Sequence, residues 1–438
     1  MMMVWALLEN TLTPEFLDDI FARSAIKQYT RKLLFSEVVG MMSAVVTRVG
    51  ASIHDIFKKS AGECNVSLTS HYNKLNGIEL TTCIMLVREV AVKLKGLIEA
   101  MGGKPPVVVE GFQTRIIDGN ALGATQHRLK VLRNTRSGPL PGKSLVILDA
   151  DHELAVDMVP HEDGHAGERS MFDTVLNLVK KGELWLADRN FCTAEFLFRL
   201  VENGAAFLIR QHASLRWNAL EPLVFPEGTK IAEHRVSIPW MNGEITARRI
   251  VLRVENKTRD GDSELVLLTT LPFTLIAAQI AELYRRRWTL EKLFHMLTMT
   301  LRCEMDTLGY PKAALFAFAV ALVAGNIVSA VRAAIRVVHG RKEEQSLSDY
   351  HLIRDVQSAY GVFDRTFAAM LQDQVRMPQV ALVTFLLECA QRLRLEAYRK
   401  APNRGHRTKK QRGTPEDAPH VSTARLLAAA AHRRTVAI

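Results

Sequence analysis

ELWLADRNFCTAEFLFRLVENGAAFLIR, residues 183–210, is the stretch that decides the fold class. Its beginning, ELWLAD (183–188), is a short apolar run that predicts a buried strand. AEFLFRLVENG (194–204) then has apolar residues at helical spacing and ends in a glycine, which predicts a helix. AAFLIR (205–210) predicts another buried strand. This alternation of strand, helix and strand indicates an α/β fold.

The residues upstream extend the same pattern. VVVEGFQTRIIDGN (107–120) contains a strand that we expect to end at Asp118. SLVILD (144–149) and LAVDMVP (154–160) flank a short polar turn and predict a hairpin. RSMFDTVLNLVKKG (169–182) predicts an amphipathic helix that is stopped by its final glycine. The predicted order is strand, hairpin, helix, strand, helix, strand, which gives an α/β core with a mixed sheet.

Helical patterns precede this core. FSEVVGMMSAVVTRVGASIHDIFKK (35–59) and TTCIMLVREVAVKLKGLIEAMGG (81–103) carry apolar residues at helical spacing. Between them, Ser67 or Thr69 is a candidate helix cap and Gly77 a candidate stop. Short helices with basic residues suit a DNA-binding module, but a plain helical packing domain has the same pattern.

The residues after the core divide into further segments. HRVSIPW (234–240), ITARRIVLRVEN (245–256) and SELVLLTTL (263–271) alternate in polarity as strands do. Helical patterns follow, and the basic chain end is rich in Pro, Gly and Asn, which predicts disorder. We therefore predict a helical N-terminal DNA-binding domain (1–105), the first part of the core (106–210), a β-rich insertion (211–273), a core helix (274–302), a C-terminal helical region (303–396) and a disordered tail (397–438).

The composition of the chain indicates which classes of binding partner and which cellular compartment to expect. The formal net charge of the 438 residues is +11, which favours a polyanionic partner, although an anionic membrane surface would explain the same excess. The five cysteines form no C-x-x-C pair, and their odd number fits a reducing cytoplasm. The N-terminus has Glu9 and no basic n-region, so we expect no signal peptide.

One apolar stretch is long enough to cross a membrane. AALFAFAVALVAGNIVSAV (313–331) reaches the length of a transmembrane helix. It is rich in alanine and is interrupted by Gly325, Asn326 and Ser329. We therefore expect a buried core helix and no membrane partner.

Three acids stand where an active site is expected. Asp118 and Asp188 each follow the apolar part of a predicted strand, and strand ends converge in α/β sheets. Two neighbouring carboxylates repel each other unless a cation lies between them, and hard oxygen ligands suit Mg²⁺ or Mn²⁺. Glu291 lies on the same helix face as Tyr284 and Arg287. The alternative for that helix is an ordinary Arg287–Glu291 salt bridge on a solvated face.

Other acids compete for these roles. Asp149 and Asp151 are rival first acids, but they occupy a predicted hairpin turn, where polar residues are common. A second group has the composition of a metal cluster but lacks H-E-x-x-H spacing, so we interpret it as a solvated loop. Its members are His161, Glu162, Asp163, His165 and Glu168.

The helix that carries Glu291 resembles a family signature. Tyr284, Arg287 and Glu291 match the Y-(2)-R-(3)-E-(6)-K pattern of the insertion-sequence-four family of bacterial DDE transposases, with Thr298 in place of the lysine. In that family the lysine contacts DNA phosphates near the cut. The departure at Thr298 implies weaker binding of transposon ends unless Lys292 or Arg302 substitutes.

Other segments extend the resemblance. IIDGN (116–120) and DRNF (188–191) are similar to the family's first and second acid motifs, and HEDGHAGERS (161–170) and LTSHYNKLNG (68–77) resemble two further segments. The family has a ribonuclease H-like core with a β-strand insertion before the glutamate. The resemblance therefore implies an α/β, ribonuclease H-like core with helical regions on both sides.

The resemblance also implies an activity, namely cut-and-paste DNA transposition. Asp118 would bridge two Mg²⁺ ions (Mn²⁺ is an alternative), and Asp188 and Glu291 would hold one each. Water would nick the strand, and the freed 3′-OH would attack the opposite strand to form a hairpin and later attack target DNA. Rival functions are a ribonuclease H-like nuclease without strand transfer and a non-catalytic DNA-binding protein derived from a transposase.

The implied partners are double-stranded DNA with terminal inverted repeats, target DNA and a second copy of the chain in a synaptic homodimer. Tyr284, Arg287, Arg189 and Lys292 are predicted to contact phosphates near the metals. Hairpin formation requires an unstacked base to be held on an aromatic ring. Trp240 and Trp217 are the candidates for that ring, and ordinary packing explains each equally well.

Overall fold

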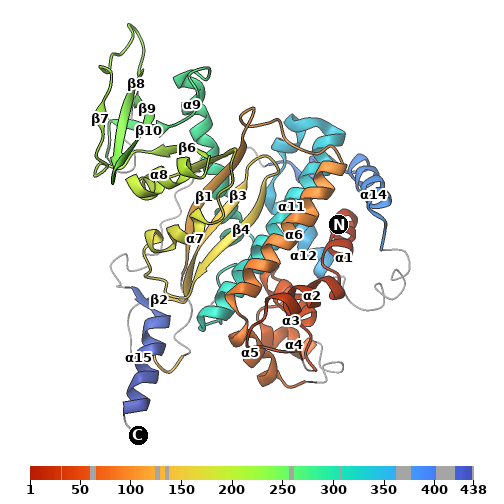
Figure 1. Ribbon diagram of the computed structural model, residues 1–438. Helices are drawn as coiled ribbons and strands as arrows, with labels where there is room; N and C mark the ends of the chain where they lie inside the picture. The colour runs from red at the N-terminus through yellow and green to blue at the C-terminus, as the bar shows by residue number, and fades with distance from the viewer. Residues whose placement is uncertain are drawn as a thin grey trace.

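The protein was analysed as a computed structural model, which describes residues 1–30, 32–59, 66–123, 129–133, 138–255, 261–305, 307–361, 376–400 and 420–436. In these residues, a large mixed sheet has the strand order β4-β3-β1-β5-β6-β10-β9-β8-β7, with helices on both faces (Figure 1). The predicted α/β class with a mixed sheet is confirmed. Its strands are β1 (Gln113–Leu122), β3 (Gly142–Asp149), β4 (Leu154–His161), β5 (Glu183–Ala187), β6 (Ala206–Arg210), β7 (Asn218–Ala219), β8 (Ile231–Trp240), β9 (Gly243–Arg253) and β10 (Glu264–Thr269).

The central strand β1 places the first acid. It pairs with β5 in parallel only as far as Ile116, but it pairs with β3 antiparallel as far as Leu122. The prediction that this strand ends at Asp118 is therefore wrong, because the β3 ladder carries it four residues further. Asp118 lies beyond the last residue paired with β5, so its carboxylate lies where the parallel part of the sheet opens.

The helix predicted over residues 169–182 is much shorter. A 3-10 turn, η1 (Glu168–Met171), leads into α7 (Phe172–Leu176), where regular helix ends. The Glu183 carboxylate accepts a hydrogen bond from the Lys180 backbone N–H at 2.9 Å, which favours a turn there instead of further helix. Gly182 has a φ of +82° and completes this turn into β5. By contrast, α8 (Ala194–Glu202) agrees with its prediction.

The β-rich segment does not form a separate sheet. β10 pairs antiparallel with β6, and β9 and β8 continue from it, so these strands extend the sheet that carries the acids. The chain then returns to the core through α9 (Ala277–Tyr284), η3 (Arg285–Arg287) and α10 (Trp288–Met299). The predicted helical segment 274–302 is thus observed, with a 3-10 turn at its three consecutive arginines.

Two apolar layers cover the sheet. Ile116 belongs to the layer packed against α6 and α11, whereas its neighbour Ile117 belongs to the layer packed against α7 and α8. This alternation follows from the two-residue period of a strand. Figure 1 shows α6 and α11 running side by side along one face of the sheet.

Helices from both ends of the chain build the α6–α11 layer. Ser67 caps α5 as predicted, because its hydroxyl accepts a hydrogen bond from the Ser70 N–H. The helical pattern of 35–59 is broken by a turn in which Arg48 has a φ of +65°, so two helices form where the spacing indicated one. The helices are α1 (Met2–Thr11), α2 (Pro14–Ser24), α3 (Phe35–Val46), α4 (Ile53–Lys59), α5 (Leu68–Gly77), α6 (Leu80–Ala100), α11 (Pro311–Ser346), α12 (Asp349–Gly361) and α14 (Gln379–Gln391), followed by the 3-10 turn η4 (Leu395–Tyr398).

The apolar helix α11 is an internal core helix. Its most apolar window has a mean hydropathy of 2.3, and 94% of that window is buried inside the protein. Asn326 in this window is also satisfied, because its side chain exchanges two hydrogen bonds of 2.8 Å with the backbone of Ala155 on the edge strand β4. The expectation of a buried core helix is confirmed.

The end of the chain departs from its prediction. Within the predicted disordered tail, 397–438, residues 401–419 and 437–438 lie outside the described part. His420–Ser422 forms β11, which pairs in parallel with β2 (Gly138–Leu140), and Thr423–Val436 forms α15. Disorder is therefore the wrong description for this part of the tail, because backbone pairing with β2 supplies an ordered contact.

Candidate active site

Asp118 is the most perturbed acid near the opening of the sheet. One of its carboxylate oxygens accepts a hydrogen bond from the Gly119 N–H, and the other accepts one from Arg287, both at 2.9 Å. Burial raises the pKa of Asp118 to about 6. The Arg287 charge opposes this rise, and the charges of Asp188 and Glu168 add to it. The carboxylate therefore lies among other negative charges, with one cation beside it.

Asp188 follows β5, the parallel neighbour of β1. It is the N-cap of a 3-10 turn, η2 (Arg189–Phe191), and its carboxylate accepts a hydrogen bond of 2.8 Å from the Asn190 N–H. The turn keeps this carboxylate near the strand end, close enough for its charge to raise the pKa of Asp118. Asp118 and Asp188 therefore lie in the same region, where the parallel part of the sheet opens.

Arg287 connects the third acid to the first. Its guanidinium makes ion pairs of 2.9 Å with Asp118 and 2.5 Å with Glu291. The Arg287 side chain is only 12% exposed, whereas Glu291 is 50% exposed. The i,i+4 salt bridge that was the alternative for this helix is therefore present, and its arginine also pairs with the buried Asp118.

Tyr284 lies beneath this arginine. It is buried, which raises its pKa to about 12, and the Arg287 guanidinium carbon lies 5.8 Å from its ring centroid. The structure thus places Tyr284 as a support for Arg287 and away from solvent. Its predicted phosphate contact would require this packing to open.

Glu168 is the acid that sequence reasoning missed. Its carboxylate packs against Gly119, where any Cβ would collide with it, and it accepts a hydrogen bond of 3.4 Å from the Asn190 side chain. Burial and the charge of Asp188 raise its pKa. The interpretation of residues 161–168 as a solvated loop is therefore wrong for Glu168, whose segment folds back onto β1. The resemblance of HEDGHAGERS to a family segment was the one available signal.

The acids fit a divalent cation by their chemistry. Carboxylate oxygens are the ligands that Mg²⁺ and Mn²⁺ prefer. Burial is the main cause of the raised pKa of Asp118, and a cation bound beside the ionised carboxylate would offset that cost. In the described part of the chain, no three His, Cys, Asp or Glu side chains are already grouped closely enough for a metal ion. In this structure the guanidinium of Arg287 pairs with both Asp118 and Glu291.

Two buried side-chain nitrogens at this site have no hydrogen-bond partner among the described residues. They are Nε of Arg287 and Nδ2 of Asn120. Asn120 lies two residues after Asp118 on the same strand, so both side chains point to the same face of the sheet. Buried donors without acceptors are rare in folded proteins, and a bound anionic group would satisfy both.

The remaining predicted DNA contacts lie around this centre. Arg189 follows Asp188 directly and lies 3.9 Å from the Asp262 carboxylate. Trp240 ends β8 opposite Gly243, and this hairpin tip packs against Phe198 of α8. Trp217 packs under Arg249, whose guanidinium carbon is 4.5 Å from its ring centroid. Packing therefore accounts for Trp217.

Lys292 lies on another face of α10. It lines a cavity of about 520 Å³ between α10 and α11, together with Arg286 and Arg341. Lys292 is therefore not beside Thr298, and Arg302 donates a hydrogen bond of 2.7 Å to the carbonyl of Ala51. Neither residue occupies the position that the substituted lysine would have.

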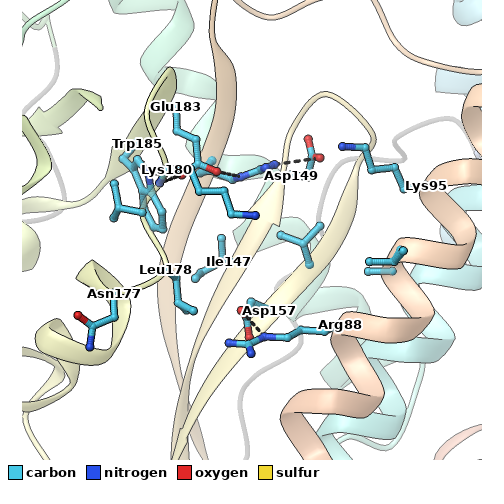
Figure 2. A pocket seen from close by; sticks show the side chains of 15 residues that line it. Arg88, Lys95, Ile147, Asp149, Asp157, Asn177, Leu178, Lys180, Glu183 and Trp185 are labelled. Atoms are coloured by element: carbon cyan, nitrogen blue, oxygen red, sulfur yellow. Dashed lines mark hydrogen bonds and ion pairs between the residues drawn. The ribbon is translucent and has the colours of Figure 1, made fainter. Parts of the chain in front are cut away.

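The rival acids Asp149 and Asp151 belong to a different, structural network. Asp149 forms ion pairs with Arg115 and His152, and the Asp151 carboxylate accepts a hydrogen bond from the Thr114 N–H. Burial opposes ionisation of Asp149, but the His152 hydrogen bond and the Arg115 charge prevail and hold its pKa at about 2. Figure 2 shows Asp149 and Glu183 beside a cavity of about 440 Å³, which is also lined by Arg88, Lys95, Asp157 and Lys180.

Comparison with known proteins places part of the chain in a described family model. Residues 112–325 match the family model described as "Transposase DDE domain", which supports a DDE transposase. The matched segment contains Asp118, Asp188 and Glu291. No curated protein sequence matches the chain.

One similar solved structure is a cryo-EM structure of a piggyBac transposase synaptic complex with hairpin DNA. It is 12% identical, and the alignment covers 95% of this chain and 87% of that chain, with a TM-score of 0.41.

Proposed function

We propose that this chain is a DDE transposase that cuts DNA at the ends of an insertion sequence and joins them to target DNA, with Asp118, Asp188 and Glu291 as its catalytic acids. The main observation behind the proposal is that the Arg287 guanidinium forms ion pairs with both Asp118 and Glu291. Two acids that are 173 positions apart in sequence thus share one partner, inside the segment that matches the transposase DDE domain.

We further propose a ribonuclease H-like core for residues 106–210 and 274–302, with 211–273 as its insertion. The arrangement that supports it is an antiparallel hairpin, β3–β4, beside β1, with β5 and β6 parallel to β1. The helical regions 1–105 and 303–396 would serve DNA binding and support. Both helical regions contribute buried side chains to the α6–α11 layer, so we propose that they form a single packed unit.

The carboxylates would hold two divalent ions, Mg²⁺ or Mn²⁺. When bound, these ions would supply positive charge for the attacking and leaving oxygens of phosphoryl transfer. Asp118, Asp188 and Glu291 would be their ligands. Asp118 must be ionised to bind a cation, so its pKa of about 6 makes binding depend on pH near neutrality.

Arg287 would have two roles. Before the cations bind, its guanidinium neutralises Asp118 and Glu291 and holds them in place. After binding, the same guanidinium would be released from the carboxylates and could donate to a DNA phosphate, since its Nε already lacks a partner among the described residues. Asn120 would donate to the same phosphate from the strand that carries Asp118. Tyr284 would position the arginine from below.

Three cations would guide the DNA along α10. Arg286, Lys292 and Arg341 line the cavity between α10 and α11. The acids of that cavity are already paired with arginines: Asp349 and Glu344 with Arg332, and Glu153 with Arg336. The positive charge of Arg286, Lys292 and Arg341 is therefore available for phosphates.

The reaction is tested with a DNA duplex that carries the inverted repeats from the flanks of the coding region, incubated with the protein and Mg²⁺. We expect nicks at the repeat, then hairpin ends, then joined products. Asp118→Asn, Asp188→Asn and Glu291→Gln should each abolish all three products while keeping DNA binding. Nicks without hairpins or joined products would favour the nuclease alternative, and full activity of Asp188→Asn would contradict the proposed triad.

A further inference from the structure

The helix α3 ends in a turn whose geometry favours glycine, but an arginine occupies it. The Val49 N–H donates to the carbonyl of Ala44 at 2.8 Å, and the Arg48 N–H donates to that of Val45 at 3.0 Å. These two bonds close the helix with position 48 in the left-handed region, at a φ of +65°. Glycine is usual there because a side chain strains a left-handed backbone. Contacts of the Arg48 side chain must therefore offset this strain.

Those contacts lie at the end of the helix that carries Glu291. Nη2 of Arg48 donates to the carbonyl of Met299 at 3.0 Å and to that of Leu301 at 3.3 Å. The last carbonyls of a helix have no partner within the helix, and a positive charge beside them is favourable. Arg48 therefore caps the C-terminal end of α10 from a distant part of the chain.

Arg302 makes the reciprocal contacts. Its backbone N–H donates to the carbonyl of Val46 at 2.8 Å, and its guanidinium donates to the carbonyl of Ala51 at 2.7 Å. Four hydrogen bonds thus join residues 299–302 to the turn at residues 46–51, which connects α3 with α4. We call these four bonds the 46–51 clamp.

The clamp leaves α10 attached at both ends. At its beginning, Arg287 pairs with Asp118 of β1, and at its end the 46–51 clamp ties it to the N-terminal helices. Glu291 lies between these attachments, one turn after Arg287, and Leu290 and Leu297 pack into the core. The position of the Glu291 carboxylate over the sheet therefore depends on both attachments as well as on this packing.

We infer that Arg48 is a positioning residue of the active site, which holds the end of α10 so that Glu291 stays beside Asp118 and Asp188. This inference rests on the proposed function, because it takes Glu291 as a catalytic acid. It also gives the N-terminal helices a part in catalysis, since the clamp belongs to the region proposed to bind DNA. Movement of that region on DNA would be passed to α10 through this turn.

Hydrogen–deuterium exchange of the full chain, without DNA or metal, tests the clamp. Arg48→Gly removes the side chain but relieves the left-handed backbone, so α3 should end at least as stably as in the wild type. We nevertheless expect the amides of residues 300–303, which are hydrogen-bonded in the wild type, to exchange at least about tenfold faster, while those of α8 keep their rate. Unchanged exchange at residues 300–303 would overturn the clamp.

Arg48→Lys is the matched control. A single nitrogen of Arg48 makes both contacts with α10, so a lysine ammonium can donate to the same two carbonyls. Arg48→Lys should therefore exchange as the wild type does. Faster exchange in Arg48→Lys, equal to that in Arg48→Gly, would contradict the role assigned to these two hydrogen bonds.

DNA cleavage separates positioning from DNA contact. Arg48→Gly should lower the nicking rate at saturating DNA by about tenfold or more, because a small misplacement of a catalytic group is costly. The dissociation constant for DNA should not change, and Arg48→Lys should restore the rate. If Arg48→Gly instead leaves the saturated rate unchanged, weakens binding and reduces the slope of log K against log salt by about 1, Arg48 contacts phosphate and the positioning role is overturned.

The two experiments also distinguish this inference from the proposed function. If the wild type nicks DNA and Arg48→Gly nicks it at the same saturated rate, the proposed function stands and the positioning role is overturned. If the wild type makes no nicks although Arg48→Gly exchanges faster at residues 300–303, the clamp stands, but the proposed function and the positioning of a catalytic acid are both overturned.

Discussion

Replacing Asp118 by asparagine should stabilise the metal-free protein while it removes activity. The pKa of Asp118 rises from 3.8 to about 6 on folding, mainly because the side chain is buried. At about 1.36 kcal/mol per pKa unit, the ionised carboxylate disfavours the folded state by about 3 kcal/mol at neutral pH. The side chain is 18% exposed, so solvent screens this energy only in part. Asparagine carries no charge, so Asp118→Asn should regain most of this free energy of folding.

The stabilising effect of Asp118→Asn should increase with pH. Because folding raises this pKa, the stability contributed by protonated Asp118 is complete below pH 3.8, falls as the pH rises, and is lost above about pH 6. The advantage of Asp118→Asn should therefore be near zero at pH 4 and complete at pH 8. Urea unfolding in the presence of a chelator, followed by tryptophan fluorescence, measures both values.

Asp149→Asn is the matched control with the opposite sign. Folding lowers the pKa of Asp149 from 3.8 to about 2, so its charge stabilises the protein above pH 3.8 and this stability is lost as the pH falls through about 2. Asp149→Asn should cost about 2 kcal/mol at pH 8. The reasoning fails if Asp118→Asn is no more stable than the wild type at pH 8, or if its advantage is equally large at pH 4.

Three further predictions concern DNA binding and the core. Arg286→Ala with Lys292→Ala should weaken DNA binding and reduce the slope of log K against log salt by about 2, as fluorescence anisotropy in a salt series would measure; an unchanged slope contradicts the phosphate contacts. Thr298→Lys should tighten binding to an inverted-repeat duplex, because it adds a cation on the face of Glu291; a control duplex without the repeat separates specific from general attraction. Asn326→Ala should destabilise the fold by about 2–4 kcal/mol in urea unfolding, because it leaves two backbone groups of Ala155 unsatisfied; a loss under 0.5 kcal/mol, the size of an ordinary surface substitution, contradicts this account.

The sequence predicted the parts of the site that depend on local pattern. Asp118 and Asp188 are predicted because each follows an apolar run of strand character, although β1 itself continues past Asp118 to Leu122. Glu291 was identified by its helical spacing from Arg287 and by the family signature. The pairing of Arg287 with Asp118 requires knowledge of how α10 docks on β1, and spacing along one helix does not contain it.

Long-range contacts account for what the sequence did not predict. Glu168 lies in a polar connecting segment whose composition resembles that of any solvated loop. Its partly buried position arises because this segment folds against Gly119. β1 continues past Asp118 because β3 pairs with it. The strand propensities of the residues in β1 contain no information about which distant strand will pair with them. The ordered end of the chain depends likewise on β2, nearly 300 residues upstream.

The packing of α6 against α11 has a consequence for synthesis of the protein on the ribosome. Leu86, Val90 and Leu94 of α6 are fully buried in the layer that α11 completes, yet α11 begins more than two hundred residues later. The nascent chain must therefore expose this apolar surface for many seconds during translation. We expect chaperones to engage the early helices, and the DNA-cutting site to mature only after nearly the whole polypeptide has emerged.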